Sequence, residues 1–210
     1  MGEKVLEIID VSNGVLKDVN LSVQKGDFFV ILAPSDSGKT TLLDLTCRRS
    51  GPLASGKILI NGVNIFSISD FDKWRAANIG YIYEENNLIS TLTAYENVEL
   101  PMLAAKVDKG KRREQVLGAL ESVGLKEKEG LYPKKLGMEE EQRVALARSI
   151  ATEPAIILAD EPTGKLKKDE TERLIALMGE LNKKTGNTFV VATHDHSLKS
   201  AASKVLELSP

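Results

Sequence analysis

FFVILAPSDSGKTTLL, residues 28–43, is the stretch that decides the fold of this chain. Its first five residues are apolar, as in a parallel strand that is buried on both faces. A turn follows, and then Gly38, Lys39 and Thr40 open an apolar pattern with helical spacing. Strand, loop and helix in this order form the setting in which backbone N–H groups at a helix N-terminus bind phosphate. The stretch therefore predicts a phosphate-binding loop.

The loop predicts a nucleotide site and a Mg²⁺ ligand. Lys39 is expected to reach the β- and γ-phosphates, and the Thr40 hydroxyl is expected to hold Mg²⁺. The pattern G-x-x-x-x-G-K-[ST] begins with glycine, whereas this chain has Ala33 there. An ordinary strand–turn–helix is the alternative, which the rest of the chain has to decide. The residues expected to bind ATP are Ser35, Asp36, Ser37, Gly38, Lys39, Thr40 and Thr41.

Composition places the chain among ordinary globular proteins. Of 210 residues, 42% are hydrophobic and 28% are charged. The net charge of −2 gives no reason to expect nucleic acid as a partner. The single cysteine, Cys47, excludes an internal disulfide and is typical of a core thiol in a reducing compartment. The N-terminus lacks the pattern of a signal peptide, and no apolar run approaches the ~20 residues of a membrane span.

The spacing of apolar residues predicts an α/β protein. Alternating segments at 5–11 and 15–23 flank Asn13-Gly14, and segments at 56–60 and 63–65 flank Asn61-Gly62, which predicts antiparallel hairpins. Apolar strands are expected at 79–83, 155–159, 188–192 and 204–208, and helices at 94–106, 111–123, 139–152 and 169–183. We therefore expect one domain over residues 1–210. Its P-loop NTPase core would be a mainly parallel sheet with helices on both faces, plus an antiparallel β subdomain and a helical insert at about 86–152.

Polar residues that end the later strands are candidates for chemistry. Asp160 and Glu161 follow an apolar strand; in P-loop NTPases an Asp here supports Mg²⁺, and an adjacent carboxylate can act as general base. An acidic pair that opens a helix at Pro162 is the alternative. His194 ends the next strand, where it could contact a γ-phosphate or the attacking water, although a structural histidine is the alternative. His194 and His196 lack a third metal ligand in the sequence.

Several blocks, in order along the chain, carry a family resemblance. The sequence resembles the ATP-binding subunits of ABC transporters from Val19 to Leu208, most closely the branch that serves lipoprotein-release, macrolide-efflux and cell-division membrane subunits. The resemblance implies two subunits that sandwich ATP, a membrane-spanning partner, and a cytoplasmic location on the inner face of the cell membrane. It rests on residues 80–83 (GYIY), 92–101 (LTAYENVELP), 141–148 (EQRVALAR), 158–164 (LADEPTG) and 192–195 (ATHD).

The chain departs from the family pattern at the Q-loop and the signature loop. Glu84 stands where the family usually has glutamine; we expect it to be a metal ligand with altered electrostatics. The signature Leu-Ser-Gly-Gly-Gln/Glu is LGMEE here, residues 136–140, so the serine and one glycine are replaced. Each like-charge contact between this acidic block and phosphate would cost on the order of 4 kcal/mol. The same charges would also stabilise their own helix start through its dipole.

Two further departures concern the dimer seam and the base. The D-loop, usually Asn-Leu-Asp, is Lys165-Leu166-Lys167. The segment between Val11 and Val19 has no aromatic residue to stack on adenine, which predicts weak nucleotide affinity.

Three functions are compatible with these features. The first is a motor subunit of an asymmetric transporter dimer, favoured as a heterodimer, with Glu161 and His194 catalytic and Thr40, Asp160 and Glu84 on Mg²⁺. The second is a catalytically impaired scaffold or regulatory subunit with the same fold. The third, a soluble ABC protein of translation or DNA repair, is weakened by the transporter-type block at residues 92–101.

Overall fold

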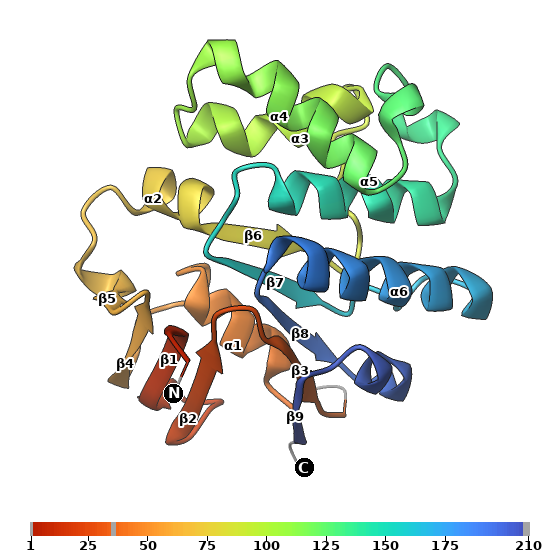
Figure 1. The fold of residues 1–210 in the computed structure, drawn as a ribbon. Coiled ribbons are helices and arrows are strands. Elements are labelled where there is room, and N and C mark those ends of the chain that lie inside the picture. The colour runs from red at the N-terminus through yellow and green to blue at the C-terminus, as the bar shows by residue number, and fades with distance from the viewer. Residues whose placement is uncertain (1, 35–36, 208–210) are drawn as a thin grey trace.

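The computed structural model describes residues 2–34 and 37–207. Its larger sheet is parallel, with strand order β6-β7-β8-β3-β9 (Figure 1). This arrangement confirms the α/β prediction. The strands are β3 (Phe28–Leu32), β6 (Ile79–Ile82), β7 (Ile156–Asp160), β8 (Phe189–Thr193) and β9 (Lys204–Glu207).

Every residue of the three central strands, β3, β7 and β8, is buried. Most of these residues are apolar, as expected of parallel strands that are covered on both faces. Phe28 pairs with Phe189 across β3 and β8, and their rings stack at a centroid distance of 5.3 Å. Alternate residues of each strand enter different apolar clusters: Val30 faces one side of the sheet, and Ile31 faces the other. The sheet is therefore covered on both faces, as predicted.

A second sheet is antiparallel, with order β2-β1-β4-β5. It consists of β1 (Lys4–Ser12), β2 (Val19–Gln24), β4 (Ser55–Ile60) and β5 (Val63–Asn64). Both predicted hairpins are present, but β1 and β2 are joined by a six-residue segment, 13–18, and their pairing is interrupted by irregularities. That longer connection brings Val15 and Leu16 to the phosphate loop, as described below.

Two helices cover opposite faces of the parallel sheet. The first, α1 (Lys39–Thr46), packs toward the antiparallel sheet; α6 (Lys168–Thr185) covers the other face. Gly186 ends α6 in the left-handed conformation, with φ +69°. Sequence analysis missed α2 (Phe71–Asn78), because this short helix buries only Phe71 and lacks a clear apolar stripe.

Three helices lie between β6 and β7, in the region that the sequence predicts to be helical (Figure 1). They are α3 (Ala94–Ala104), α4 (Lys109–Ser122) and α5 (Met138–Ile150), with short 3₁₀ turns between α4 and α5. A capping box between Thr93 and Glu96 starts α3. No other residue than glycine fits at Gly80, because a Cβ there would lie 2.0 Å from the Ser149 carbonyl oxygen of α5. This close approach locks α5 against β6.

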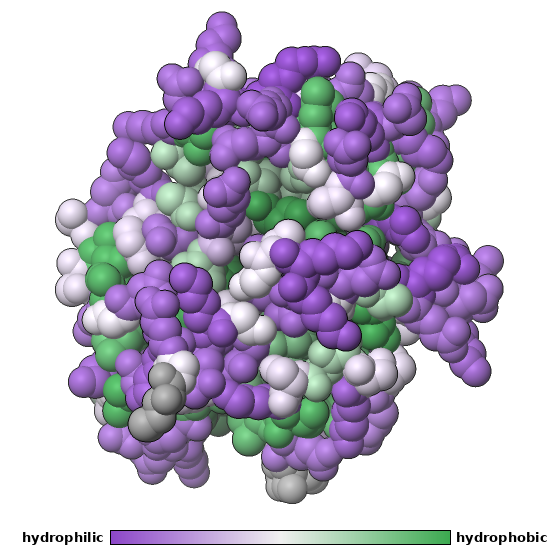
Figure 2. Space-filling model, viewed as in Figure 1, coloured by the Kyte–Doolittle hydropathy of each residue, from purple (hydrophilic) through white to green (hydrophobic). Residues whose placement is uncertain are grey.

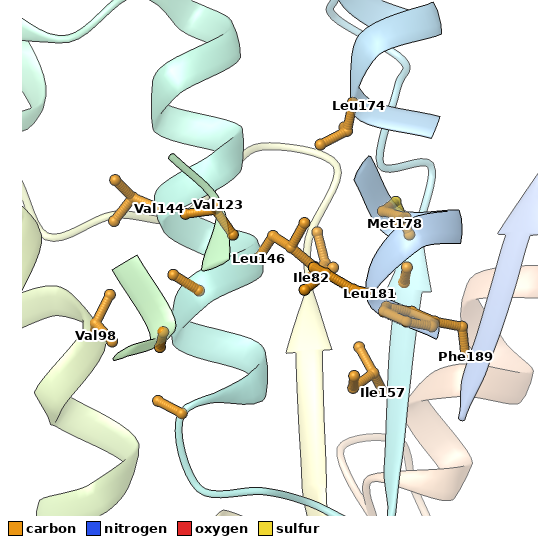
Figure 3. Close-up of a cluster of buried hydrophobic side chains, with 14 of the residues drawn as sticks. Ile82, Val98, Val123, Val144, Leu146, Ile157, Leu174, Met178, Leu181 and Phe189 are labelled. Carbon is orange, nitrogen blue, oxygen red and sulfur yellow. The ribbon is translucent and has the colours of Figure 1, made fainter. Parts of the chain in front are cut away.

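The helical insert, α6 and one face of the parallel sheet share one apolar cluster. Figure 3 shows Leu146 of α5 beside Ile82 of β6 and Val144 beside Val123, with Leu181 of α6 on the side of Phe189. The surface in Figure 2 is mostly hydrophilic, with apolar side chains in scattered patches. Within residues 2–34 and 37–207, no helix is both long and apolar enough to span a bilayer.

Candidate functional site

The predicted site residues meet at the carboxyl ends of β3, β7 and β8, the edge at which parallel sheets bind ligands. Thr40 and Thr41 lie in the first turn of α1, and the Gly38 N-cap has φ +86°. A glycine is required at Gly38 for this left-handed conformation. Ser35 and Asp36 were also expected to bind phosphate, and they lie outside the described residues.

Lys39 holds the phosphate loop in shape. Its Nζ donates hydrogen bonds to the carbonyl oxygens of Ala33 at 2.7 Å and Pro34 at 2.6 Å. The same ammonium lies 3.5 Å from Glu161 Oε1, and its side chain is almost fully buried. The Lys39 ammonium therefore bridges its own loop and the Glu161 carboxylate. A phosphate anion can compete for this ammonium, because the carbonyl oxygens of Ala33 and Pro34 carry only partial charge.

Glu161 contacts more of the predicted site residues and their neighbours than a single pairing would require. Its Oε1 lies 2.8 Å from His194 Nδ1 and accepts a hydrogen bond from the His194 backbone amide at 3.1 Å. Its Oε2 accepts a 2.7 Å bond from the Thr193 hydroxyl. The Glu161 backbone has φ +44°, an uncommon conformation for this residue type. The fold thus brings together the two predicted catalytic residues, Glu161 and His194, with Lys39.

The residues predicted to hold Mg²⁺ also gather here. Asp160 is buried, yet its Oδ1 has no hydrogen-bond partner within residues 2–34 and 37–207. Burial raises the pKa of Asp160; the Thr40 hydroxyl opposes this rise, while the charges of Glu161 and Glu84 add to it. An unpartnered buried carboxylate oxygen beside other carboxylates and a hydroxyl suits a hard cation.

Glu84 lies in the loop after β6, beside the same carboxylates. Its Cγ would be 3.7 Å from a Cβ on Gly164, and Glu161 Cβ is equally near that position. In the described part of the chain, no three His, Cys, Asp or Glu side chains form a metal-chelating group by themselves. Mg²⁺ usually takes one or two carboxylates and completes its shell with water and substrate phosphates.

A hollow of about 220 Å³ lies beside the loop, lined by Val15 and residues 37–41. Among the described residues, the buried Ser37 Oγ has no hydrogen-bond partner. Val15, exposed at 65%, forms an apolar wall of this hollow. Sequence analysis missed this contact because Val15 precedes Ser37 by 22 positions and only the β1–β2 connection brings it close.

The signature segment differs from its prediction. Glu139 accepts hydrogen bonds from Arg173 Nη2 at 2.7 Å and from Arg143 Nη2 at 2.5 Å, and Glu140 pairs with Lys128. The hydrogen bond from Arg173 is the largest of the interactions that keep the pKa of Glu139 below its ordinary value. The expected repulsion of about 4 kcal/mol per contact therefore overstates the effect, since basic partners on α6, α5 and the 3₁₀ turn balance these charges.

The loop after β6 is bonded to the D-loop segment and to α5. Lys165 of the D-loop segment lies 2.6 Å from Glu85, in the loop after β6. Arg148 of α5 donates hydrogen bonds to the carbonyl oxygens of Asn86 at 2.6 Å and Asn87 at 2.7 Å. The loop that carries Glu84 is thus anchored both to the signature helix and to the segment after β7.

Comparison with known proteins agrees with this geometry. The family model described as ABC transporter matches residues 16–164. The ABC transporter ATP-binding protein YtrE of Bacillus subtilis is 39% identical over 196 residues, which cover 92% of this chain and 84% of the relative. The lipoprotein-releasing system ATP-binding protein LolD of Bordetella avium is 36% identical over 197 residues, with 93% and 85% coverage.

A solved structure is similar over nearly the whole fold. The dimeric post-hydrolysis state of the ATP-binding cassette MJ0796, bound to ADP and Pi, superposes with a TM-score of 0.83 and 33% identity, covering 97% of this chain and 94% of that one. The matched family model extends over more than half of the residues and includes the phosphate loop, Asp160 and Glu161. The chain therefore belongs to the family of ABC transporter ATP-binding proteins.

Proposed function

We propose that this chain binds MgATP and hydrolyses it as the ATP-binding subunit of a transporter whose membrane-spanning subunit is a separate chain. The observation that carries the proposal is the meeting of Lys39, Glu161 and His194 at one sheet edge, beside the unpartnered Oδ1 of Asp160. In this proposal residues 1–210 act as one nucleotide-binding domain, with about 86–152 as its helical insert.

Each residue has a proposed task. Ser35, Asp36, Ser37, Gly38, Lys39, Thr40 and Thr41 surround the phosphates of ATP, with Lys39 on the β- and γ-phosphates. Glu161 is the general base for the attacking water, and His194, held through Nδ1, presents Nε2 to that water beside the γ-phosphate. Thr40, Asp160 and Glu84 would hold Mg²⁺, which when bound neutralises charge on the β- and γ-phosphate oxygens.

Lys39 and His194 also explain how Glu161 is kept ready. Both groups contact Glu161 Oε1, so they fix the position of the carboxylate oxygen that would accept the proton. A phosphate oxygen would compete for Lys39, because it carries more charge than the single carboxylate oxygen that it replaces. Glu161 Oε1 would then have one partner fewer and could accept a hydrogen bond from the attacking water.

We further propose that the chain works in an asymmetric dimer, with a heterodimer favoured, on the inner face of the cell membrane and without nucleic acid. Met138 supports this: it stands where the family has a small residue, and it is 51% exposed at the start of α5. A side chain there keeps backbone donors farther from a partner's phosphate. An intact signature on a different subunit would complete the site that contains Glu161.

The test is steady-state ATPase activity of the purified chain, alone and with its membrane subunit and the second ATP-binding subunit. Glu161→Gln is expected to lower kcat by about 10²- to 10⁴-fold while MgATP binding, measured with a fluorescent ATP analogue, is retained. Glu172→Gln is the matched control, because Glu172 lies on α6 outside the site. No turnover in any combination, or turnover that Glu161→Gln leaves intact, would refute catalysis by this site.

A scaffold or regulatory subunit is the second candidate. It is favoured by the exposed Met138 and by the Lys165–Glu85 pair, which commits the D-loop segment to its own chain. Calorimetry separates the two: heat of MgATP binding at millimolar nucleotide supports the enzyme, and its absence leaves the scaffold.

A further inference from the structure

The hydroxyl of Thr193, the last residue of β8, has hydrogen-bond partners that fix the direction of its proton. The residue is fully buried, at 0% exposure, and its Oγ accepts a 2.9 Å hydrogen bond from the Asp195 amide. The same hydroxyl lies 2.7 Å from Glu161 Oε2. A carboxylate oxygen can only accept, and an amide N–H can only donate. The one hydroxyl proton of Thr193 is therefore directed at Glu161.

A second set of bonds fixes Asp195 and, through it, Thr193. Asp195 Oδ2 accepts a 3.0 Å hydrogen bond from the buried Thr163 hydroxyl, which lies in the segment after β7. Asp195 Oδ1 accepts from the Ser197 amide at 2.9 Å and its hydroxyl at 2.6 Å. Burial raises the pKa of Asp195, but the Ser197 and Thr163 hydrogen bonds outweigh it and leave the pKa below its ordinary value. Asp195 is thus an anionic acceptor throughout the neutral range.

We propose that Thr193 is a positioning residue that sets the orientation of the Glu161 carboxylate, and that Asp195 and Thr163 hold Thr193 in place. The two oxygens of Glu161 thereby have different partners: Oε2 is bound to the buried Thr193 hydroxyl and lies 3.3 Å from the His194 amide, and Oε1 faces Lys39 Nζ and His194 Nδ1. Oε1 is then the oxygen on the side where the attacking water would give up its proton. A carboxylate without the Thr193 anchor can rotate and exchange these roles.

This inference rests on the proposed role of Glu161, and the matched variants are Thr193→Val and Thr193→Ser. Valine keeps the shape of the side chain and removes the hydroxyl; serine keeps the hydroxyl. We expect Thr193→Val to lower kcat by about 10- to 100-fold with KM for ATP changed less than threefold, and Thr193→Ser to restore most of kcat. In a Glu161→Gln background, Thr193→Val should cause no further loss, because the group that it positions is already disabled.

A second measurement does not depend on turnover. The chain has two histidines, so His196→Gln leaves His194 as the only one. Long-range ¹⁵N–¹H NMR at pH 8, where an ordinary imidazole is neutral, then reports which ring nitrogen bears the proton. We expect the Nδ1–H tautomer, donated to Glu161, in the His196→Gln protein and in its Thr193→Ser derivative. Thr193→Val should shift the population toward Nε2–H.

Thr163→Val extends the test by one bond, and circular dichroism checks that each variant is folded. This substitution should lower kcat less than Thr193→Val does, since the Asp195 amide still holds the Thr193 hydroxyl. An unchanged tautomer in Thr193→Val, or a loss of kcat that serine fails to restore, overturns the positioning role. A wild-type chain without turnover, both alone and with its partner subunits, refutes the proposed catalysis instead, and the tautomer then decides the role of Thr193 by itself.

Discussion

Leu16 lies directly against Gly38: a Cβ on Gly38 would come within 2.8 Å of Leu16 Cδ2. Leu16 belongs to the connection between β1 and β2, so this contact joins the antiparallel sheet to the phosphate loop. Gly38 is therefore constrained twice, by its φ of +86° and by its neighbour. The glycine of the motif serves the packing of the two sheets as well as phosphate binding.

Gly38→Ala should lower the free energy of unfolding by about 2–3 kcal/mol, combining the left-handed backbone with overpacking against Leu16. Urea unfolding followed by circular dichroism measures the effect. Gly62→Ala is the control: Gly62 also has positive φ, +75°, but open space around its Cβ position. It should cost about 1 kcal/mol. Equal losses in the two variants would show that the Leu16 contact is unimportant.

Asp160→Asn is expected to stabilise the nucleotide-free protein at neutral pH by an amount on the order of 1 kcal/mol. The pKa of Asp160 is raised in the folded state, chiefly by burial, so the folded protein keeps this proton to higher pH than the unfolded chain does. Stability from this group is thus lost as pH rises from the ordinary carboxyl pKa through the folded pKa. Asparagine does not ionise, so the variant does not lose this stability as the pH rises. The substitution also removes the proposed Mg²⁺ ligand.

Thermal unfolding in EDTA at pH 4 and pH 7 measures this difference. The gain over wild type should be larger at pH 7 than at pH 4. Asp72→Asn is the control, because the Asp72 side chain is 94% exposed. A variant that is less stable than wild type at pH 7 would contradict the raised pKa as the dominant effect.

Val15→Tyr should tighten ATP binding by about tenfold, because stacking of a base on an aromatic ring contributes roughly 1–3 kcal/mol. Val15 lines the hollow beside the phosphate loop and is exposed, so a larger ring has room there. Titration with a fluorescent ATP analogue measures the affinity. Val63→Tyr, at another exposed valine on the distant β5, should leave it unchanged. If both variants bind like wild type, the base does not lie over Val15.

Arg173→Ala should weaken nucleotide-dependent activity about three- to tenfold while leaving the free energy of unfolding nearly unchanged. The stability change is small because Arg173 is half exposed, but its loss leaves part of the Glu139 charge unbalanced at the start of α5. The double variant Glu139→Gln with Arg173→Ala should recover the activity.

ATPase assays of the two single variants and the double variant form the cycle that tests this coupling. Lys4→Ala, which removes an exposed ion pair with Glu7 on β1, is the control and should behave like wild type. Additive losses in the double variant would mean that Arg173 acts other than through Glu139.

Most of the elements and their order could be predicted from the sequence. Continuous apolar runs are typical of buried parallel strands, so strands at 28–32 and 155–159 could be predicted, and β3 and β7 lie there at Phe28–Leu32 and Ile156–Asp160. Gly38, Lys39 and Thr40 indicated phosphate chemistry because local backbone conformation and side-chain type are both set by nearby residues. The short helix α2 escaped because a helix with a single buried residue leaves almost no periodic signal.

Which charges face one another depends on contacts between segments that are distant in the sequence. Glu139 looked like an obstacle to phosphate until α6 brought Arg173 to it from 34 positions away. The Thr193 hydroxyl, the Val15 wall and the Lys165–Glu85 pair likewise depend on contacts between distant segments. Electrostatic and hydrogen-bond energies vary steeply with distance and burial. Residue types along a chain therefore indicate the chemistry that is available, and the fold determines which groups are close enough to use it.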